Sequence, residues 1–426
     1  MGPIRRIAEK RGVPLVDLML QTIKRMGRRA TLLAICPTSE AVTKAAIQAA
    51  REHDAPILYA ATLNQVDLDG GYTGWTPRDL VARVEAYTKE LSFKGDAAVC
   101  SDHCGPYCKD IHTIEKWPIG PAMWGVSASV VAAMQAGYDL LHIDPTTDRT
   151  LPPGEAIKIE TVIDRTVALI SAVERARRAA GYPRIGYEVG TEEVHGGLAD
   201  LSTFRKFLDG LKAGLSRAGL SDAWPAFVVG KVGTDLHTTY FDPSVAQHLV
   251  KAAAGYGSFI KGHYTDYCAN LEAYPASGMG GANVGPEFTE VEYKALMALA
   301  DDEEQLVKSG KAQPSNFKET LTKAVVDSGR WKKWLQPGEA GRDFAQLEAS
   351  RREWLIETGC RYVWTAGEVA SARLKLYSNL DSNGIDAEPR VVKAVAEAIG
   401  KYVDKFNLAG LNGEIAKTLR KKDAGI

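Results

Sequence analysis

The sequence predicts an α/β protein, a (β/α)8 TIM barrel with an α-helical C-terminal extension. Short apolar runs and amphipathic segments alternate eight times over about 260 residues, which is the repeat and the length of such a barrel. A doubly wound open sheet is the runner-up, but no G-x-G-x-x-G motif follows the first apolar run. The sequence therefore favours a closed barrel of parallel strands.

Eight short apolar runs supply the predicted strands. They are TLLAIC (31–36), PILYAAT (56–62), AAVCSDH (97–103), LLHIDPT (140–146), IGYEVGT (185–191), AFVVGKVGT (226–234), FIKGHYT (259–265) and GANVGPE (281–287). Amphipathic segments between them, such as 39–53, 161–181 and 243–257, are predicted helices. With a helical lead-in over residues 1–30, the barrel is assigned to residues 1–290.

After residue 290 the pattern changes to longer, charged helices at 290–310, 316–329 and 389–406. We therefore predict that residues 291–426 form an α-helical region packed on the barrel. No low-complexity linker separates the two parts, so the boundary near residue 290 is approximate.

The composition is that of a soluble globular protein, with 45% hydrophobic and 25% charged residues. Lys and Arg (52) nearly balance Asp and Glu (53), which predicts no nucleic-acid face. The first residues lack the apolar segment of a signal peptide, and no stretch is long enough to span a membrane. We expect a cytoplasmic protein whose six cysteines are mainly small buried hydrophobes.

Polar residues gather where the predicted strands end, and that end carries the active site of a (β/α)8 barrel. In strand order they are Asp102 and His103; Asp144; Glu188, Glu192, Glu193 and His195; Asp235 and His237; His263 and Asp266; and Asn283. Five of the eight histidines (103, 142, 195, 237 and 263) lie in or just beyond strand ends. Random placement would scatter them, so the pattern predicts a functional site.

A metal site is one interpretation of the segment AAVCSDHCGPYCKD (97–110), and a polar turn with small cysteines nearby is the other. In a barrel, His103, His237 and His263 can converge on one ion, and a catalytic zinc commonly has three protein ligands. We predict these three histidines as ligands, with Glu188 as an extra one. Zn²⁺ is the favoured metal, with Mn²⁺, Co²⁺ or Ni²⁺ as alternatives. His142 is interpreted as a core histidine that faces away from the neighbours of Asp144.

Several stretches resemble the class II (zinc-dependent) sugar-phosphate aldolases and, more closely, the tagatose-bisphosphate aldolase accessory (Z) subunit family. They are NQVDLDGGYTGWTP (64–77), SDHC (101–104), HID (142–144), IGYEVGTEEVHGG (185–197), GHYTDY (262–267), VGPEFT (284–289) and RYVW (361–364). The resemblance covers roughly residues 30 to 400. It implies that His103 is a metal ligand and Asp102 a proton-transfer residue. Some members of the wider family are thought to be ketohexose-phosphate 4-epimerases.

The chain also departs from these families. No GGSG-like phosphate loop follows His263, and the nearest glycine-rich stretch is SGMGGANVG (277–285), whose backbone could still cradle a phosphate. The arginine that the accessory family has before RYVW is missing, because this chain reads IETGC there.

We predict a metal-dependent enzyme that acts at C3–C4 of a ketohexose or its phosphate, of fructose or tagatose type, with C4 epimerisation as the outcome. Asp102 is the expected base, and Glu192 or Glu193 is expected to move a proton at C3. The alternative is a non-catalytic stabilising subunit for a class II tagatose-1,6-bisphosphate aldolase chain. We expect a homo-oligomer and neither a nucleic-acid nor a membrane partner.

The sequence also predicts a set of substrate-binding residues around the barrel mouth. They are Asn64, Gln65, Asp67, Tyr72, Asp144, Asp266, Gly281, Asn283, Gly285 and Arg361. For Asn64, Gln65 and Asp67 the alternative is that they satisfy the backbone of their own loop.

Overall fold

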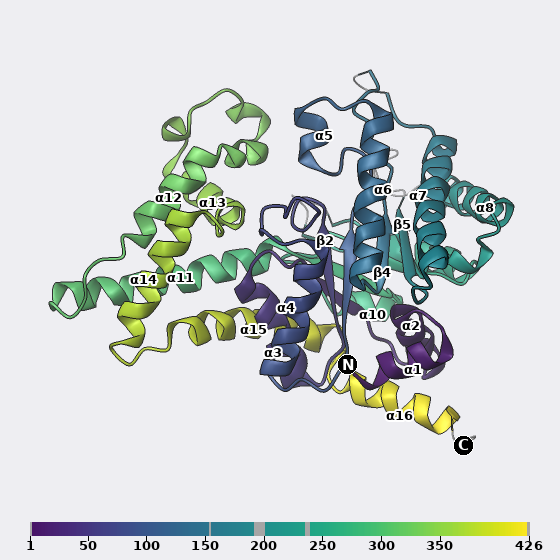
Figure 1. Cartoon of the computed structure of the whole chain (residues 1–426), viewed down its shortest axis with the longest axis horizontal. Helices are drawn as coiled ribbons and strands as arrows, with labels where there is room; N and C mark the ends of the chain where they lie inside the picture. Colours follow the sequence, from purple (N-terminus) through teal and green to yellow (C-terminus); the bar gives the residue numbers. More distant parts are fainter. Residues whose placement is uncertain (1, 153–154, 191–200, 235–238, 424–426) are drawn as a thin grey trace.

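The computed structural model describes residues 2–152, 155–190, 201–234 and 239–423, and at its centre is a closed barrel of eight parallel strands in sequential order (Figure 1). The strands are β1 (Leu32–Ile35), β2 (Ile57–Thr62), β3 (Ala97–Asp102), β4 (Leu140–Ile143), β5 (Gly186–Gly190), β6 (Phe227–Val229), β7 (Phe259–Gly262) and β8 (Gly281–Val284). Each of the eight predicted runs contains one of them. The predicted fold class is confirmed.

The register closes the barrel and brings the polar strand ends to one rim. Ala34 in β1 lies opposite both Leu58 in β2 and Asn283 in β8, so the first strand joins the last. His142 in β4 lies opposite Glu188 in β5. Because all strands run in the same direction, the residues that follow them lie at the same end of the barrel.

An outer ring of helices covers the barrel. Its members are α3 (Glu40–His53), α4 (Pro77–Glu90), α5 (Asp110–Ile114), α6 (Ile119–Ala136), α7 (Ile159–Ala180), α8 (Leu201–Arg217), α9 (Pro243–Ala254), α10 (Ala273–Ser277) and α11 (Pro286–Lys308). Local sequence signals set their ends: the Ser39 side chain accepts the Val42 N–H at the start of α3, and Gly137 ends α6 in the left-handed conformation.

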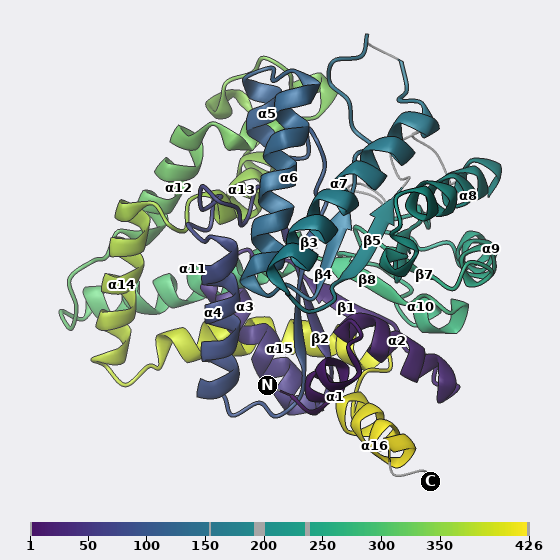
Figure 2. The same ribbon diagram turned by 45° about the vertical axis from the view of Figure 1, so that its right-hand side comes forward.

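The two N-terminal helices, α1 (Pro3–Arg11) and α2 (Leu15–Arg25), lie at the amino-terminal end of the barrel (Figure 2). The Asp96 carboxylate accepts the backbone N–H groups of Ile4 and Arg5, just before β3 begins. The Arg5 guanidinium pairs with Asp139, just before β4, through both Oδ atoms. These contacts hold α1 against the end of the barrel that is opposite to the predicted site.

The C-terminal region is helical, as expected, and its last helix packs beside α1 and α2. Its helices are α12 (Phe317–Ser328), α13 (Ala349–Gly359), α14 (Gly367–Asp381), α15 (Ala387–Lys405) and α16 (Leu411–Asp423). Short 3-10 turns of this region lie at η2 (Arg330–Trp334), η3 (Pro337–Glu339), η4 (Phe344–Gln346) and η5 (Cys360–Tyr362), and a further one, η1 (Ser221–Ala223), precedes β6 in the barrel.

Helices α11 to α14 project from the barrel as an arm with a hydrophobic cluster of its own (Figure 1). Helix α15 then returns along α3 and joins the main core, and α16 packs beside α1 and α2. The predicted division near residue 290 stays a prediction. Among the described residues, no helix is both long and apolar enough to cross a membrane.

Candidate functional site

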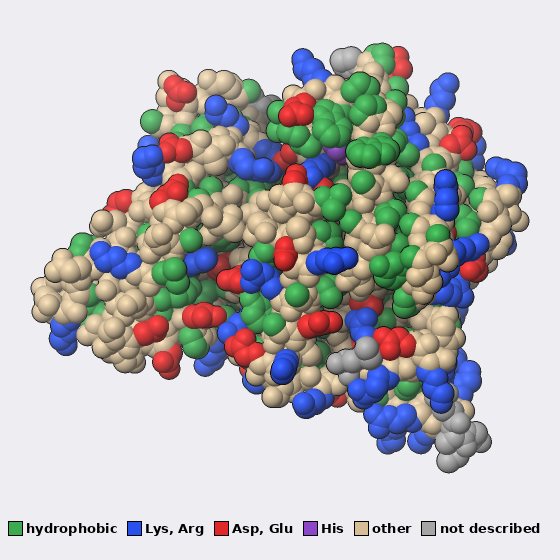
Figure 3. Space-filling view, viewed as in Figure 1, with side chains coloured by type: hydrophobic (Ala, Val, Ile, Leu, Met, Phe, Trp, Pro, Cys, Tyr) green, Lys and Arg blue, Asp and Glu red, His purple; other side chains and the backbone are tan. Residues whose placement is uncertain are grey.

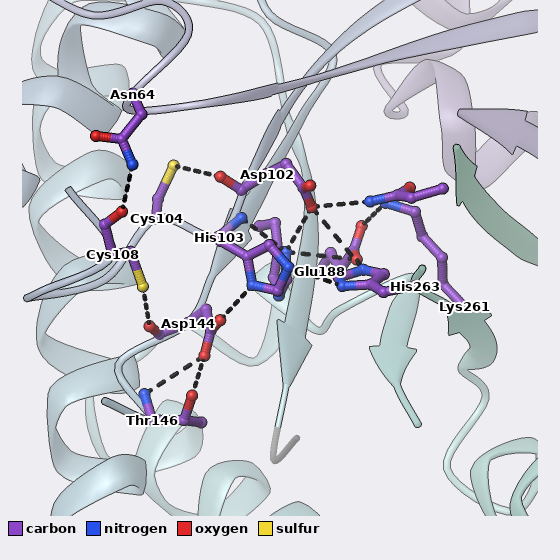
Figure 4. Close-up of polar contacts among 12 residues, drawn as sticks. Asn64, Asp102, His103, Cys104, Cys108, Asp144, Thr146, Glu188, Lys261 and His263 are labelled. Atoms are coloured by element: carbon purple, nitrogen blue, oxygen red, sulfur yellow. Dashed lines mark hydrogen bonds and ion pairs between the residues drawn. The ribbon is translucent and has the colours of Figure 1, made fainter. Parts of the chain in front are cut away.

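A buried cluster of histidines and carboxylates lies at the ends of β3, β4, β5 and β7 (Figure 4). Ligand atoms of Asp102, His142, Glu188 and His263 all lie within 4.8 Å of one another. His103 completes the cluster, because its Nε2 lies 2.9 Å from Nδ1 of His263. Sequence reasoning predicted four of these five residues for the site, and His142 is the addition.

The chain turns sharply after β3, and this turn places His103. His103 itself has a positive φ of 46°. Cys104 then bridges to the end of β4, because its N–H donates to the His142 carbonyl and its carbonyl accepts the Asp144 N–H. Gly105 is required at this approach, because a Cβ there would lie 1.6 Å from the Asp144 carbonyl oxygen. The DHCG sequence therefore serves to dock the end of β3 onto the end of β4.

Asp144 orients the His103 ring. Its Oδ2 lies 2.6 Å from His103 Nδ1, and its Oδ1 accepts the Thr146 hydroxyl. Burial by itself would raise the pKa of Asp144, but the hydrogen bond and charge of His103 hold it well below its usual range. A carboxylate on Nδ1 leaves Nε2 of His103 directed at the cluster. With both oxygens engaged, Asp144 supports His103, whereas we had expected it to contact substrate.

His142 lies inside the cluster, so its interpretation as a core histidine facing away from the neighbours of Asp144 is wrong. Its ring centroid lies 4.9 Å from that of His103 and 5.2 Å from that of His263. The physical reason is that residues two apart on a strand share a face, so His142 and Asp144 both point towards the site. The spacing in HID was the available signal, because His142 and Asp144 are two residues apart on one strand.

Lys261 is the second residue that sequence reasoning missed. Its Nζ lies 2.6 Å from Glu188 Oε2, and both side chains are essentially inaccessible, at 1% and 0% exposure. The other Glu188 oxygen, Oε1, lies 3.1 Å from His263 Nε2. A lone lysine in the apolar run FIKG was the available signal, since lysine is rarely buried without a partner.

Asp102 is held ionised at the end of β3. Burial opposes its charge, but the charges of His103 and His263 and the contact with His142 hold its pKa well below the usual range. Asn283 Nδ2 donates to Asp102 Oδ1 at 3.0 Å. In the described part of the chain, the buried Oδ1 of Asn283 has no hydrogen-bond partner, which leaves one acceptor at this point of the site.

The donor set suits a divalent metal ion. Imidazole nitrogens and carboxylate oxygens are ligands for Zn²⁺, Mn²⁺, Co²⁺ and Ni²⁺, and the buried Asp, His and Glu side chains converge closely enough to hold one cation. The Cys104 Sγ faces the Asp102 carbonyl at 3.8 Å, and burial raises the pKa of its thiol. The predicted residues Glu192, Glu193 and His237 lie outside the described residues.

The loop after β2 uses two of its predicted substrate-binding residues for its own contacts. The Asn64 side chain bonds the Cys108 carbonyl and the Asp110 N–H. The Asp67 carboxylate accepts Lys109 Nζ at 2.5 Å and the Leu68 N–H at 2.8 Å. These contacts join the loops after β2 and β3, so the structural alternative describes Asn64 and Asp67 better than substrate binding does.

Gln65 is engaged in part. Its Oε1 accepts the Thr62 N–H at 3.0 Å, and the side chain is 6% exposed. Asp266 accepts the N–H groups of Gly285 and Glu287 at the start of α11, and burial raises its pKa to about 6. Asp266 and Gly285 thus contact each other at the strand ends.

Gly281 lies at the other end of β8, as the first residue of that strand. A Cβ at this position would lie 3.0 Å from Phe227 Cζ, so packing against that ring explains the glycine. Gly281 therefore lies away from the strand ends, and a substrate-binding role for it stays a prediction.

Tyr72 and Tyr362, the chain neighbour of Arg361, meet at the junction between the loop after β2 and the C-terminal arm. The Tyr72 ring packs edge-on against Tyr362, with 5.1 Å between the ring centroids, and the Thr365 hydroxyl donates to the Tyr72 carbonyl. Arg361 is 5% exposed and contacts the Tyr362 hydroxyl. Tyr72 thus joins the loop after β2 to the C-terminal arm.

Comparison with known proteins gives consistent matches. Residues 17–402 match the family described as D-tagatose-1,6-bisphosphate aldolase subunit GatZ/KbaZ-like. A D-tagatose 6-phosphate 4-epimerase of Agrobacterium fabrum is 30% identical over 387 residues, which are 86% of this chain and 88% of that protein.

Two solved structures share the fold. A probable tagatose 6 phosphate kinase from Sinorhizobium meliloti 1021 has a TM-score of 0.71 at 24% identity, over 88% of this chain and 100% of that one. A fructose-bisphosphate aldolase from Campylobacter jejuni has a TM-score of 0.53 at 9% identity, over 93% and 95% of the two chains. At these identities the similarity concerns the fold alone.

Proposed function

Because the chain belongs to the D-tagatose-1,6-bisphosphate aldolase subunit GatZ/KbaZ-like family, we propose that it is a divalent-metal-dependent 4-epimerase of a ketohexose phosphate of tagatose or fructose type. The observation that carries the proposal is Asp102, a buried and ionised carboxylate set among three imidazoles at a strand end. The 4-epimerase from Agrobacterium fabrum, at 30% identity, supports the choice of reaction.

Inversion at C4 by this route begins when a base takes the proton of the C4 hydroxyl. The electrons of the C3–C4 bond then pass to C2–C3 as an enediolate, and C4 becomes an aldehyde. The aldehyde turns its other face, the bond re-forms, and the proton returns to the oxygen on C4. Every atom is retained, so the reaction needs no co-reactant.

Asp102 is suited to both proton transfers. It is ionised at neutral pH, so it can accept the C4 hydroxyl proton, and its lowered pKa favours giving the proton back. Asn283 fixes one Asp102 oxygen, and its own unpartnered Oδ1 is placed to accept a hydroxyl of the sugar. Glu192 and Glu193 stay predicted proton-transfer residues for C3.

His103 and His263, whose ring nitrogens lie 2.9 Å apart, are the proposed metal ligands. Glu188, which contacts His263, is the proposed further ligand. A divalent cation bound there would supply Lewis-acid stabilisation of negative charge on substrate oxygens. Zn²⁺ is the proposed metal. His237 stays the predicted third histidine, and His142 is the alternative that the cluster offers.

The test is to purify this chain alone, load it with Zn²⁺, Mn²⁺, Co²⁺ or Ni²⁺, and follow ¹³C-labelled D-tagatose 6-phosphate and D-fructose 6-phosphate by NMR. The C4 epimer should form without accumulation of free triose. Asp102→Asn keeps the shape and the contact to Asn283, so metal content should hold while turnover falls by about 10²–10⁴-fold. Unchanged turnover in Asp102→Asn would refute its role.

The second candidate is a non-catalytic subunit, and the family description favours it because it names an aldolase subunit. On this reading, the isolated chain would convert no ketose phosphate with any of the four metals. Cleavage of D-tagatose 1,6-bisphosphate would then increase only when a partner class II aldolase chain is added. Comparing the chain alone with the mixture therefore separates the two functions.

A further inference from the structure

Arg361 is a buried arginine without an ion-pair partner in the described part of the chain. Its side chain is 5% exposed, and within the described residues its guanidinium donates only to two hydroxyls, Thr358 Oγ1 and the Tyr362 phenol, each at 3.2 Å. The guanidinium carbon lies 4.9 Å from the ring centroids of Trp334 and Tyr362. Buried guanidinium groups are normally paired with an anion, so this position lacks one.

The Glu290 carboxylate, whose pKa the charge of Arg361 affects, is already engaged. Arg361 lowers the pKa of Glu290, but burial and neighbouring charge leave that pKa raised, and Glu290 accepts the Tyr267 hydroxyl. The Arg361 guanidinium is therefore a fixed positive charge beside two hydroxyl groups, and no carboxylate of the described residues pairs with it. That is the arrangement of an anion-binding site, because a carboxylate would compete with the ligand.

Two further cations lie on the same surface. Arg330 Nη2 and Lys333 Nζ, both from η2, contact the Asp110 carboxylate at 2.7 and 3.1 Å. The Arg330 guanidinium also lies 4.3 Å from the centroid of the Tyr362 ring. Arg361 and Arg330 thus approach the same Tyr362 ring, and of the three cations only Arg330 and Lys333 have a carboxylate partner in the described part of the chain. Figure 3 shows Lys and Arg side chains, with Asp and Glu side chains beside them, in the hollow between the arm and the α5–α6 end of the barrel.

The cationic cluster connects to the active site through Tyr72. The Tyr72 ring packs edge-on against Tyr362, and its N–H donates to the Asn64 carbonyl in the loop after β2. Gln65, the next residue of that loop, accepts the Thr62 N–H, and Thr62 at the end of β2 lies opposite Asp102 in the strand register. The loop after β2 thus joins the arm to the strand end that carries the proposed base.

We propose that Arg361, with Arg330 and Lys333, binds the phosphate group of the phosphorylated ketose at the junction of the C-terminal arm and the loop after β2. The identity of the sugar rests on the proposed function, whereas phosphate binding by these residues does not. The arm would then select phosphorylated over unphosphorylated sugars, and the reacting carbons would lie at Asp102. The proposal assigns the C-terminal arm a part in substrate specificity.

The test is titration of the full-length chain with inorganic phosphate and with D-tagatose 6-phosphate, by calorimetry and ³¹P NMR, with D-tagatose as the unphosphorylated control. Arg361→Met should lower the affinity for inorganic phosphate and for D-tagatose 6-phosphate about 10–100-fold, as expected for loss of a charge-assisted contact. Arg330→Met and Lys333→Met should weaken them about 3–10-fold. Lys332→Met is the matched control, because Lys332 lies over the Trp331 ring and not at Asp110.

Three results would overturn the proposal. The first is wild-type protein that binds neither phosphate ligand, and the second is folded Arg361→Met protein with unchanged affinity. The third result applies if Arg361→Met does not fold. It is that Arg330→Met and Lys333→Met bind phosphate as tightly as the control Lys332→Met does.

Activity separates this proposal from the epimerase proposal. If no epimer forms but the variants lose phosphate, the phosphate site stands and the proposed reaction falls. If the enzyme is active and Arg361→Met keeps the wild-type ratio of kcat/KM between phosphorylated and free sugar, the phosphate site falls alone.

Discussion

Lys261→Met should destabilise the protein strongly, because it removes the only cation in direct contact with the Glu188 carboxylate among the described residues apart from the cluster histidines. The two groups are 2.6 Å apart, and neither is accessible to water. Methionine has nearly the length of lysine, so the change removes the charge and leaves little space. Glu188 would then be a buried carboxylate whose contacts are His263 and, at 3.6 Å, His142.

Two independent arguments give the magnitude. Burial opposes the charge of Glu188, yet Lys261, His142 and His263 lower its pKa from 4.5 to about 2. At about 1.4 kcal/mol per unit this shift corresponds to roughly 3 kcal/mol of stability. Breaking a buried ion pair by removing one partner typically costs about 3–5 kcal/mol. We therefore expect Lys261→Met to lose about 3–5 kcal/mol of unfolding free energy at neutral pH.

The assay is denaturant unfolding of metal-free protein, followed by circular dichroism and fluorescence. It is applied to Lys261→Met, to Glu188→Gln and to the double variant that carries both changes. The double variant should recover part of the loss, because no unpaired charge stays buried. Lys323→Met, which removes a lysine from an exposed pair with Asp327, is the control and should unfold like the wild type.

The pH dependence has a defined sign. The pKa of Glu188 is depressed, so its stabilisation is complete above pH 4.5 and is lost as the pH falls through about 2. The difference in unfolding free energy between the wild type and Lys261→Met should therefore narrow as the pH is lowered from 5 towards 3. A variant as stable as the wild type at pH 7, or a double variant no better than Lys261→Met, would refute the reasoning.

Two further predictions concern positions away from the buried pair. Asp17 has a buried Oδ2 without a hydrogen-bond partner in the described residues, and burial raises its pKa from 3.8 to about 7. Its charge thus destabilises the fold increasingly as the pH rises from 4 to 7, so Asp17→Asn should gain about 1–3 kcal/mol at pH 8 and nothing near pH 4, measured by denaturant unfolding at each pH; an equal gain at both pH values would contradict this. Gly105→Ala should displace the turn that carries His103, lowering both thermal stability and zinc stoichiometry, whereas Gly120→Ala, where a Cβ meets nothing within 4 Å, should change neither; unaltered zinc content in Gly105→Ala would show that the loop can adapt.

The sequence alone determined the barrel and the family. Each apolar run is buried on both sides in the structure, and a strand covered on both faces shows itself as a short continuous apolar segment. Asp102, His103 and His263 could be placed at the site because parallel strands bring all their carboxyl ends to one rim, whatever the details of packing. The family assignment made from motifs such as NQVDLDGGYTG is confirmed by the match over residues 17–402.

The tertiary structure decided which of these groups touch. Strand periodicity gives the face of a residue, but the neighbour across the barrel depends on register and closure, so the contact of His103 with His263, 160 positions apart, has no local signal. The same holds for Lys261 beside Glu188 and for Tyr362 beside Tyr72. Polar loop residues such as Asn64 could serve substrate or backbone equally well by type. Only the packed loops showed which, because hydrogen-bond partners are chosen by distance in space and not by position in the chain.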